Sequence, residues 1–191
     1  MLFRSAVSDV GLYAGFVENR NGRYRIRLLR IRTATASTLA ESTEELSMPS
    51  PRPRRAGLLY RRGAAGLRVV SYDGSQDRPL KLNDGRVGMA IWSADGRTVL
   101  YLSTPDEPGR TSSIRENTPD TNTDKLVAPT SQFVSFARNS DGSMFVGASA
   151  NKGSPYVLLL LRLTRRELTL CEHRATDPTH VPLFFAPSSQ K

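Results

Sequence analysis

The chain has few of the residues that build disulfide frameworks, metal clusters and membrane spans. Its 191 residues include one cysteine, Cys171, and two histidines, His173 and His180. A single cysteine excludes an intramolecular disulfide and a metal site made of several thiolates. The longest apolar run, 156–161, has the length of a strand, whereas a membrane-spanning helix needs about 20 apolar residues. We therefore expect no membrane span, and we interpret Cys171 as a small residue of a strand.

Motifs of the common enzyme classes are also missing. The sequence has no Gly-x-Ser-x-Gly turn, no phosphate-binding glycine loop and no zinc spacing. Glu172 and His173, with Asp177 nearby, could be drawn as an acid–base cluster. Neighbouring residues of a strand point to opposite faces of the sheet, so Glu172 and His173 would not share a site. The residues alone therefore assign no catalytic role.

Positive charge is abundant, and almost all of it is arginine. Lysine and arginine together number 27 against 18 acidic residues, which gives a net charge of +9. The arginines concentrate in 20–32 and 52–62. They could form an electropositive surface for an acidic polymer such as a polyuronate or nucleic acid, or they could be outward-facing positions of strands and loops. Their alternation with apolar residues favours the second interpretation. Because no aromatic platform is interleaved with them, nucleic-acid binding ranks last.

The most informative feature is a repeated turn. The run Trp-Ser-Ala-Asp-Gly-Arg begins at Trp92 and leads into a strand, and a related run from Phe136 reaches its Asp-Gly pair at Asp141. The pattern begins a third time at Phe185. The Asp-Gly pairs at Asp95 and Asp141 are 46 residues apart, and the two phenylalanines are 49 apart. A period of this length, carried by short strands and tight turns, is typical of a β-propeller blade.

The repeated side chains have structural interpretations that we prefer to functional ones. Trp92 and Phe136 could offer a stacking surface for a sugar, but their equivalence in the repeat indicates packing between blades. Asp95 and Asp141 are turn residues, whose carboxylates can bond the backbone that follows them.

Four such units follow one another along the chain, and a fifth begins. Each contains short alternating strands separated by turns rich in Gly, Asn, Asp or Pro, and no segment has convincing helical periodicity. The alternation slips at Leu28–Leu29, where we expect a β-bulge. We place the blades at 3–43, 46–83, 88–128 and 132–174, with the start of another at 181–191.

These units predict an all-β fold, a single partial β-propeller of four-stranded antiparallel blades over 1–191. Closed propellers have about four to eight blades, and the last unit stops at its first strand. We therefore expect a fragment of a larger propeller. Met1–Ser5 shows no basic segment leading into an apolar stretch, as a signal peptide would, so the chain either is not exported or lacks its natural start.

The repeat units resemble those of known propellers. Residues 88–191 resemble the WD-like repeats of TolB-type β-propellers, and 134–191 resemble the repeats of oligogalacturonide lyase. The TolB resemblance implies a bacterial binding or scaffold module of the periplasm. The lyase resemblance implies a cytoplasmic enzyme that cleaves pectin fragments by β-elimination, with a divalent metal such as manganese held by histidines and a glutamine. His180 is the metal ligand that it implies here, although Val181-Pro182 replaces the second histidine of the family's pair.

We predict a binding or scaffold module without a cofactor, whose ligand on the propeller face is a protein partner or an acidic oligosaccharide. The alternative is a lyase-like, metal-dependent β-elimination of uronate oligosaccharides. Nucleic-acid binding through the arginine-rich stripe comes third. The resemblance places ligands at the central channel or on the loops of one face. The candidate loops are Glu18–Gly22, Arg61–Gly66, Ser103–Gly109 and Ala150–Pro155.

Overall fold

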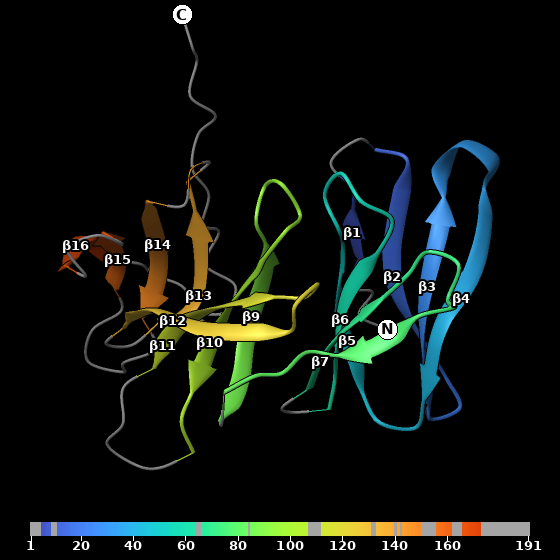
Figure 1. Ribbon diagram of the computed structural model, residues 1–191, viewed down its shortest axis with the longest axis horizontal. Coiled ribbons are helices and arrows are strands. Elements are labelled where there is room, and N and C mark those ends of the chain that lie inside the picture. Colours follow the sequence, from blue (N-terminus) through green and yellow to red (C-terminus); the bar gives the residue numbers. More distant parts are fainter. Residues whose placement is uncertain are drawn as a thin grey trace, which may run out of the picture. The chain divides into compact units, whose positions relative to one another are not determined.

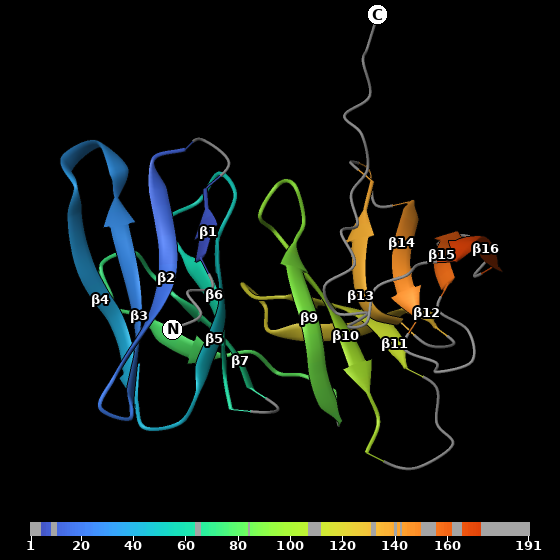
Figure 2. The same cartoon turned by 180° about the vertical axis from the view of Figure 1, so that it is seen from behind.

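The computed structural model of the chain consists of strands and one 3-10 turn, Ile31–Thr33, in the part that it describes (Figures 1 and 2). Those strands form four sheets of four strands each, and neighbours in a sheet are neighbours along the chain. The predicted all-β fold of four-stranded antiparallel sheets is confirmed. The described residues are 5–8, 11–63, 66–83, 85–106, 112–130, 133–139, 141, 143–149, 156–161 and 166–172.

The first two sheets are built from the first eight strands. The first contains β1 (Ser5–Val7), β2 (Tyr13–Arg20), β3 (Arg23–Arg30) and β4 (Thr35–Ser42). The second contains β5 (Leu46–Pro51), β6 (Leu58–Arg62), β7 (Gly66–Val70) and β8 (Asp77–Pro79). Asn21 and Gly22 turn the chain between β2 and β3 with φ angles of 53° and 75°, because these two residue types tolerate the left-handed region.

The other two sheets follow in the same manner. The third contains β9 (Arg86–Trp92), β10 (Val99–Thr104), β11 (Ser113–Thr118) and β12 (Thr123–Pro129). The fourth contains β13 (Phe133–Arg138), β14 (Met144–Ser149), β15 (Tyr156–Leu161) and β16 (Arg166–Glu172). Cys171 lies in β16 and is exposed, so its interpretation as a strand residue is confirmed.

Strand β3 shows why these sequences form sheets. Ile26 and Leu28 are fully buried, whereas Arg25 and Arg27 alternate with them and form ion pairs with Glu18. Successive residues of a strand point to opposite faces, so this alternation buries one face and leaves the other to the charges. The arginines of this strand are therefore outward-facing positions, as their spacing indicates.

The bulge of the first sheet lies on a different strand from the one predicted. β2 and β3 pair in continuous register through Gly15–Leu28 and Ala14–Leu29, so the expectation at Leu28–Leu29 is wrong. The register shifts instead between β3 and β4, where Leu39 is the extra residue. Because β4 is the last strand of its sheet, an extra residue there disturbs pairing on one side only. Leu39 is 7% exposed and belongs to the core.

The chain divides into two compact units. The first consists of the described residues within 1–83, 90–99 and 117–124, and the second of the other described residues. In the first unit the sheets approach closely at Gly15, where a Cβ atom would stand 2.5 Å from Leu58 Cδ1. The core of this unit contains residues from the first and second sheets. Its buried members are Ile26, Leu28, Leu39, Leu46, Leu58, Tyr60 and Val70.

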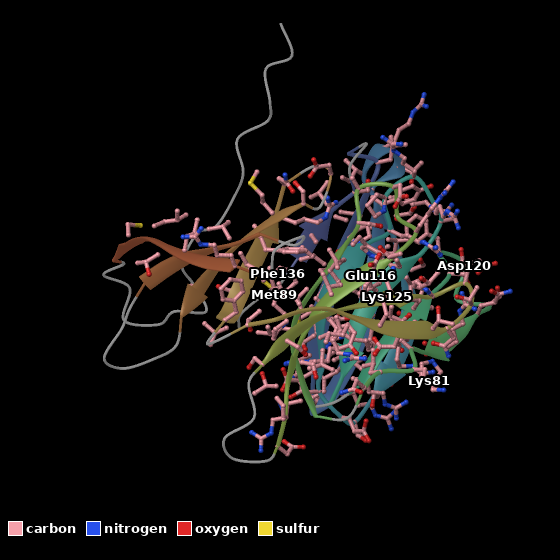
Figure 3. All side chains as sticks on the ribbon, turned by 60° about the vertical axis from the view of Figure 1, so that its left-hand side comes forward. Lys81, Met89, Glu116, Asp120, Lys125 and Phe136 are labelled. Carbon is pink, nitrogen blue, oxygen red and sulfur yellow. The ribbon has the colours of Figure 1, made fainter. Side chains whose placement is uncertain are left out.

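Aromatic side chains mark the core of the second unit. The rings of Phe136 and Phe145 meet edge to face, with centroids 6.1 Å apart, and both are fully buried. The backbone N–H of Phe136 points at Met89 Sδ, 3.4 Å away (Figure 3). Trp92, its counterpart in the repeat, is 5% exposed in the first unit. Both residues are buried, as their positions in the repeat predict.

The Asp-Gly turns are held by an ionised carboxylate. Asp95 Oδ1 accepts hydrogen bonds from the backbone N–H of Arg97 at 3.0 Å and from the Ser93 hydroxyl at 2.7 Å. These bonds lower the pKa of Asp95. Gly96 follows with a φ of 67°, a conformation that costs glycine little.

Two further turns repeat this arrangement. Asp73 accepts hydrogen bonds from the Ser71 hydroxyl and from the backbone N–H and hydroxyl of Ser75, which lower the pKa of Asp73 to about 2. The backbone N–H of Ser143 donates to Asp141 Oδ1 at 2.8 Å. The Ser143 hydroxyl and this backbone bond lower the pKa of Asp141. Each carboxylate therefore stabilises its turn only while it is ionised.

These turns predict a loss of stability in acid. An unfolded aspartate has a pKa of about 3.9, so the stabilisation is present above about pH 4 and is lost as the pH falls through the lower folded-state values. We expect the thermal midpoint, followed by circular dichroism, to fall from about pH 4 downward. The double variant Asp73→Asn, Asp95→Asn should have a lower thermal midpoint than the wild type at pH 7. Its midpoint should also fall less as the pH is lowered. A midpoint that falls as steeply with pH as that of the wild type would contradict this account.

Candidate functional site

A pocket of about 300 Å³ lies in the first unit. Three turns contribute to it: the turns between β1 and β2, between β5 and β6, and between β7 and β8. We call it the arginine pocket because three of the seven described residues that line it are arginines. The lining residues are Ser8, Tyr13, Arg52, Arg54, Arg55, Ala56 and Tyr72.

The arginines belong to a proline-bounded turn that follows β5. Pro53 restricts Arg52 to extended conformations, and the backbone N–H of Arg52 bonds the Gly57 carbonyl at 2.7 Å to close the turn. Arg54 has a φ of 55°, in the left-handed region that non-glycine residues rarely adopt. As a result Arg52 is buried, whereas Arg54 and Arg55 are exposed.

Arg52 is an anchored cation rather than a free one. It is 8% exposed, and its Nε donates to the Gly96 carbonyl at 2.6 Å. Its guanidinium carbon stands 5.0 Å from the centre of the Trp92 ring, a cation–π distance. Trp92 Nε1 in turn donates to the Ser50 carbonyl at 3.0 Å. These contacts fix the position of the Arg52 guanidinium beside the pocket.

Asp120 supplies the carboxylate of this cluster (Figure 3). It lies in the turn between β11 and β12, with its side chain 45% exposed. Arg55 Nη1 donates to Asp120 Oδ2 at 2.7 Å, and Arg52 Nη2 donates to both oxygens at 3.2 and 3.3 Å. Arg78 Nη2 stands 3.5 Å from Oδ1. Partial burial would raise the pKa of Asp120, but the bonds and charges of Arg52 and Arg55 outweigh it and lower that pKa.

The cluster has an excess of positive charge. Arg52, Arg55 and Arg78 share the single carboxylate of Asp120, and Arg54 forms no ion pair within the part of the chain that the structure describes. Among the described residues of this cluster, four guanidinium groups thus stand against one carboxylate. A concave surface with such an imbalance attracts anions, and arginine binds carboxylates with paired N–H donors.

Two tyrosines form the other wall of the pocket. The rings of Tyr13 and Tyr72 lie 4.7 Å apart and are tilted by 41°, and both pack against the core of the first unit. Ser8 supports this wall, because its hydroxyl accepts the backbone N–H groups of Leu12 and Tyr13 at 3.2 and 3.1 Å. Aromatic walls with a few polar groups are typical of ligand pockets. This pocket suits a ligand that joins a ring to an acidic group.

Comparison with solved structures identifies the fold. Oligogalacturonate lyase in complex with manganese has a TM-score of 0.80 and 15% identity, with 89% of this chain matching 53% of that one. Oligogalacturonate lyase from Vibrio parahaemolyticus has a TM-score of 0.77 and 18% identity, with 91% of this chain matching 55% of that one. TolB from Acinetobacter baumannii has a TM-score of 0.70 and 15% identity, with 86% of this chain matching 42% of that one. The chain is part of a β-propeller.

The likeness to these propellers is one of fold, and the chain spans about half of their length. The predicted resemblance to TolB and to oligogalacturonate lyase is confirmed at this level. No protein-family model matches the chain, and no curated protein matches it. In this fold the four sheets are blades 1 to 4, in chain order.

The metal ligand implied by the lyase resemblance is not among the residues placed here. His180 lies outside the described residues, as does His173. Among the described residues no group of three or more His, Cys, Asp or Glu side chains could hold a metal ion. In the same part of the chain, no helix is long and apolar enough to cross a membrane.

The described parts of the loops predicted to bind ligand are not among the residues that line the pocket. Glu18–Gly22 joins the second and third strands of blade 1, at the opposite end of the sheet from the pocket turn. Arg61–Gly66 and Ser103–Gly109 are described in part, and Ala150–Pro155 lies outside the described residues. Sequence reasoning missed the pocket, although the run Pro-Arg-Pro-Arg-Arg from Pro51 to Arg55 was its visible signal.

The contacts of Arg52 predict that lysine cannot replace it. Arg52→Lys keeps the charge but loses the planar fork that reaches Gly96 and Asp120 together. We expect Arg52→Lys and Arg52→Gln each to lower the free energy of unfolding by about 1–3 kcal/mol, measured by urea denaturation. Arg32→Gln, at an exposed position of the 3-10 turn, is the control and should change little. Full stability of Arg52→Lys would refute the anchoring role.

Proposed function

We propose that the chain is part of a β-propeller binding module that recognises an acidic oligosaccharide at the arginine pocket. The observation that carries the proposal is the imbalance, among the described residues, of four guanidinium groups and one carboxylate beside a pocket with an aromatic wall. The β-propeller fold supports it, because propellers serve as scaffolds for many unrelated sites.

The size and composition of the pocket suit one sugar residue and its acidic group. Small-ligand pockets measure about 300 to 1,000 Å³, so a pocket of about 300 Å³ is at the small end of that range. The paired rings of Tyr13 and Tyr72 give the pocket an apolar lining for a sugar ring, and Arg54 and Arg55 offer donors to a carboxylate. A uronate residue combines both chemical features.

An acidic protein segment is the other ligand with compatible charge. Its carboxylates would use the same guanidinium groups, but it would lack the repeating sugar ring beside the tyrosines. The lyase alternative rests on the likeness of fold and on His180. Under that alternative, the protein supplied with Mn²⁺ would release unsaturated uronate products from an oligogalacturonide.

Binding to trigalacturonate tests the proposal directly. By titration calorimetry we expect the chain to bind trigalacturonate but not its methyl ester, which keeps the rings and loses the charges. Affinity should fall as salt rises, because salt screens exposed charges. Arg54→Gln and Arg55→Gln should each weaken binding about twofold to fivefold, the effect of losing one exposed ion pair. Arg32→Gln should bind like the wild type.

Three other outcomes have distinct meanings. Equal binding of the acid and its ester, or unchanged binding by Arg54→Gln, would rule out the arginine pocket as the site. Tighter binding of a triglutamate peptide than of trigalacturonate would favour a protein ligand. Release of unsaturated uronate on addition of Mn²⁺, detected by its ultraviolet absorbance, would favour the lyase.

A further inference from the structure

We propose that Asp120 is a built-in competitor of the ligand: its carboxylate occupies Arg55, and a ligand carboxylate takes that place when it binds. The inference rests on the proposed function, because it concerns the same pocket. It adds the chemical group that the pocket accepts and the residue that sets its affinity.

The contacts of Asp120 show the group that these arginines accept. Its Oδ2 lies 2.7 Å from Arg55 Nη1, and both its oxygens lie within 3.3 Å of Arg52 Nη2. Both arginines line the pocket. A planar carboxylate therefore already satisfies two of the three guanidinium groups of the pocket. A ligand carboxylate can reproduce these bonds with the same geometry.

The two arginines differ in how firmly they are held. Arg52 keeps its bonds to the Gly96 carbonyl and to Asp120 and its contact with Trp92, so it stays in place when the bond between Asp120 and Arg55 opens. Arg55 is 42% exposed, and Asp120 is its ion-pair partner. Exposed ion pairs contribute little net stability. The exchange therefore takes place at Arg55.

Asp120 has other partners when its bond to Arg55 opens. Arg78, which lies on β8 and does not line the pocket, stands 3.5 Å from Asp120 Oδ1. After exchange, Asp120 remains paired with Arg52 and Arg78. The turn itself stays fixed, because Asn122 Oδ1 accepts the backbone N–H of Lys81 at 2.7 Å. Only the side chain of Asp120 has to turn.

Two variants of opposite expected effect test the competition. In Asp120→Asn the side chain keeps its shape and one hydrogen-bond acceptor but loses its charge, so trigalacturonate should bind about twofold to fivefold more tightly. In Arg78→Gln, Asp120 keeps Arg52 and Arg55 but loses the partner outside the pocket. It should then hold Arg55 more firmly, so the same probe should bind more weakly. In the Asp120→Asn background, Arg78→Gln should have almost no effect, because the coupling between them is gone.

Asp106→Asn provides the matched control. Asp106 pairs with Arg86 at 3.0 Å on the surface, and its loss changes the net charge equally without touching the pocket. Wild-type affinity or weaker binding in Asp120→Asn, with binding by the wild type intact, would overturn the competition alone. Absence of binding by both would overturn the proposed function with it. Binding by Asp120→Asn where the wild type fails would support the competition. The thermal midpoint of each variant should be measured, because a midpoint close to that of the wild type would exclude misfolding as the cause.

Discussion

The first compact unit depends on one buried guanidinium. A cation taken out of water needs acceptors close by, and Arg52 finds them in the Gly96 carbonyl of blade 3 and the carboxylate of Asp120. This requirement brings the turn after β5 against two turns of the third sheet. Arg54 and Arg55, its neighbours in sequence, then lie on the exposed side of the same turn. The charge of the pocket follows from the way in which a structural cation is buried.

The fold was largely predictable because its signals are local. Period-two alternation, as in β3, and the Asp-Gly turns at Asp95 and Asp141 report contacts between residues close in sequence. The bulge was misplaced because it depends on how β4 pairs with β3. Alternation within one strand carries no information about that pairing. Leu29 looks like a slip of the alternation in the sequence, yet its strand pairs with β2 without interruption.

The candidate site was hidden for a related reason. Its decisive bonds join Arg52 to residues 44 and 68 positions away, and no motif links those positions in sequence. Pro51–Arg55 could be recognised as an irregular basic turn, but its orientation could not. His180 remains a prediction from resemblance. Likeness of fold at 15% identity does not carry the chemistry of one propeller to another, because the scaffold accepts many sites.

The place of Trp92 has a spectroscopic consequence. It is the single tryptophan of the chain, it belongs to the first compact unit, and it faces a guanidinium. Its fluorescence therefore reports the state of that unit, whereas the far-ultraviolet signal of the backbone sums over both units. Comparison of the two signals thus distinguishes unfolding of the first unit from unfolding of the second without any added label. Coincidence of the two signals would mean that the units open as a single cooperative body.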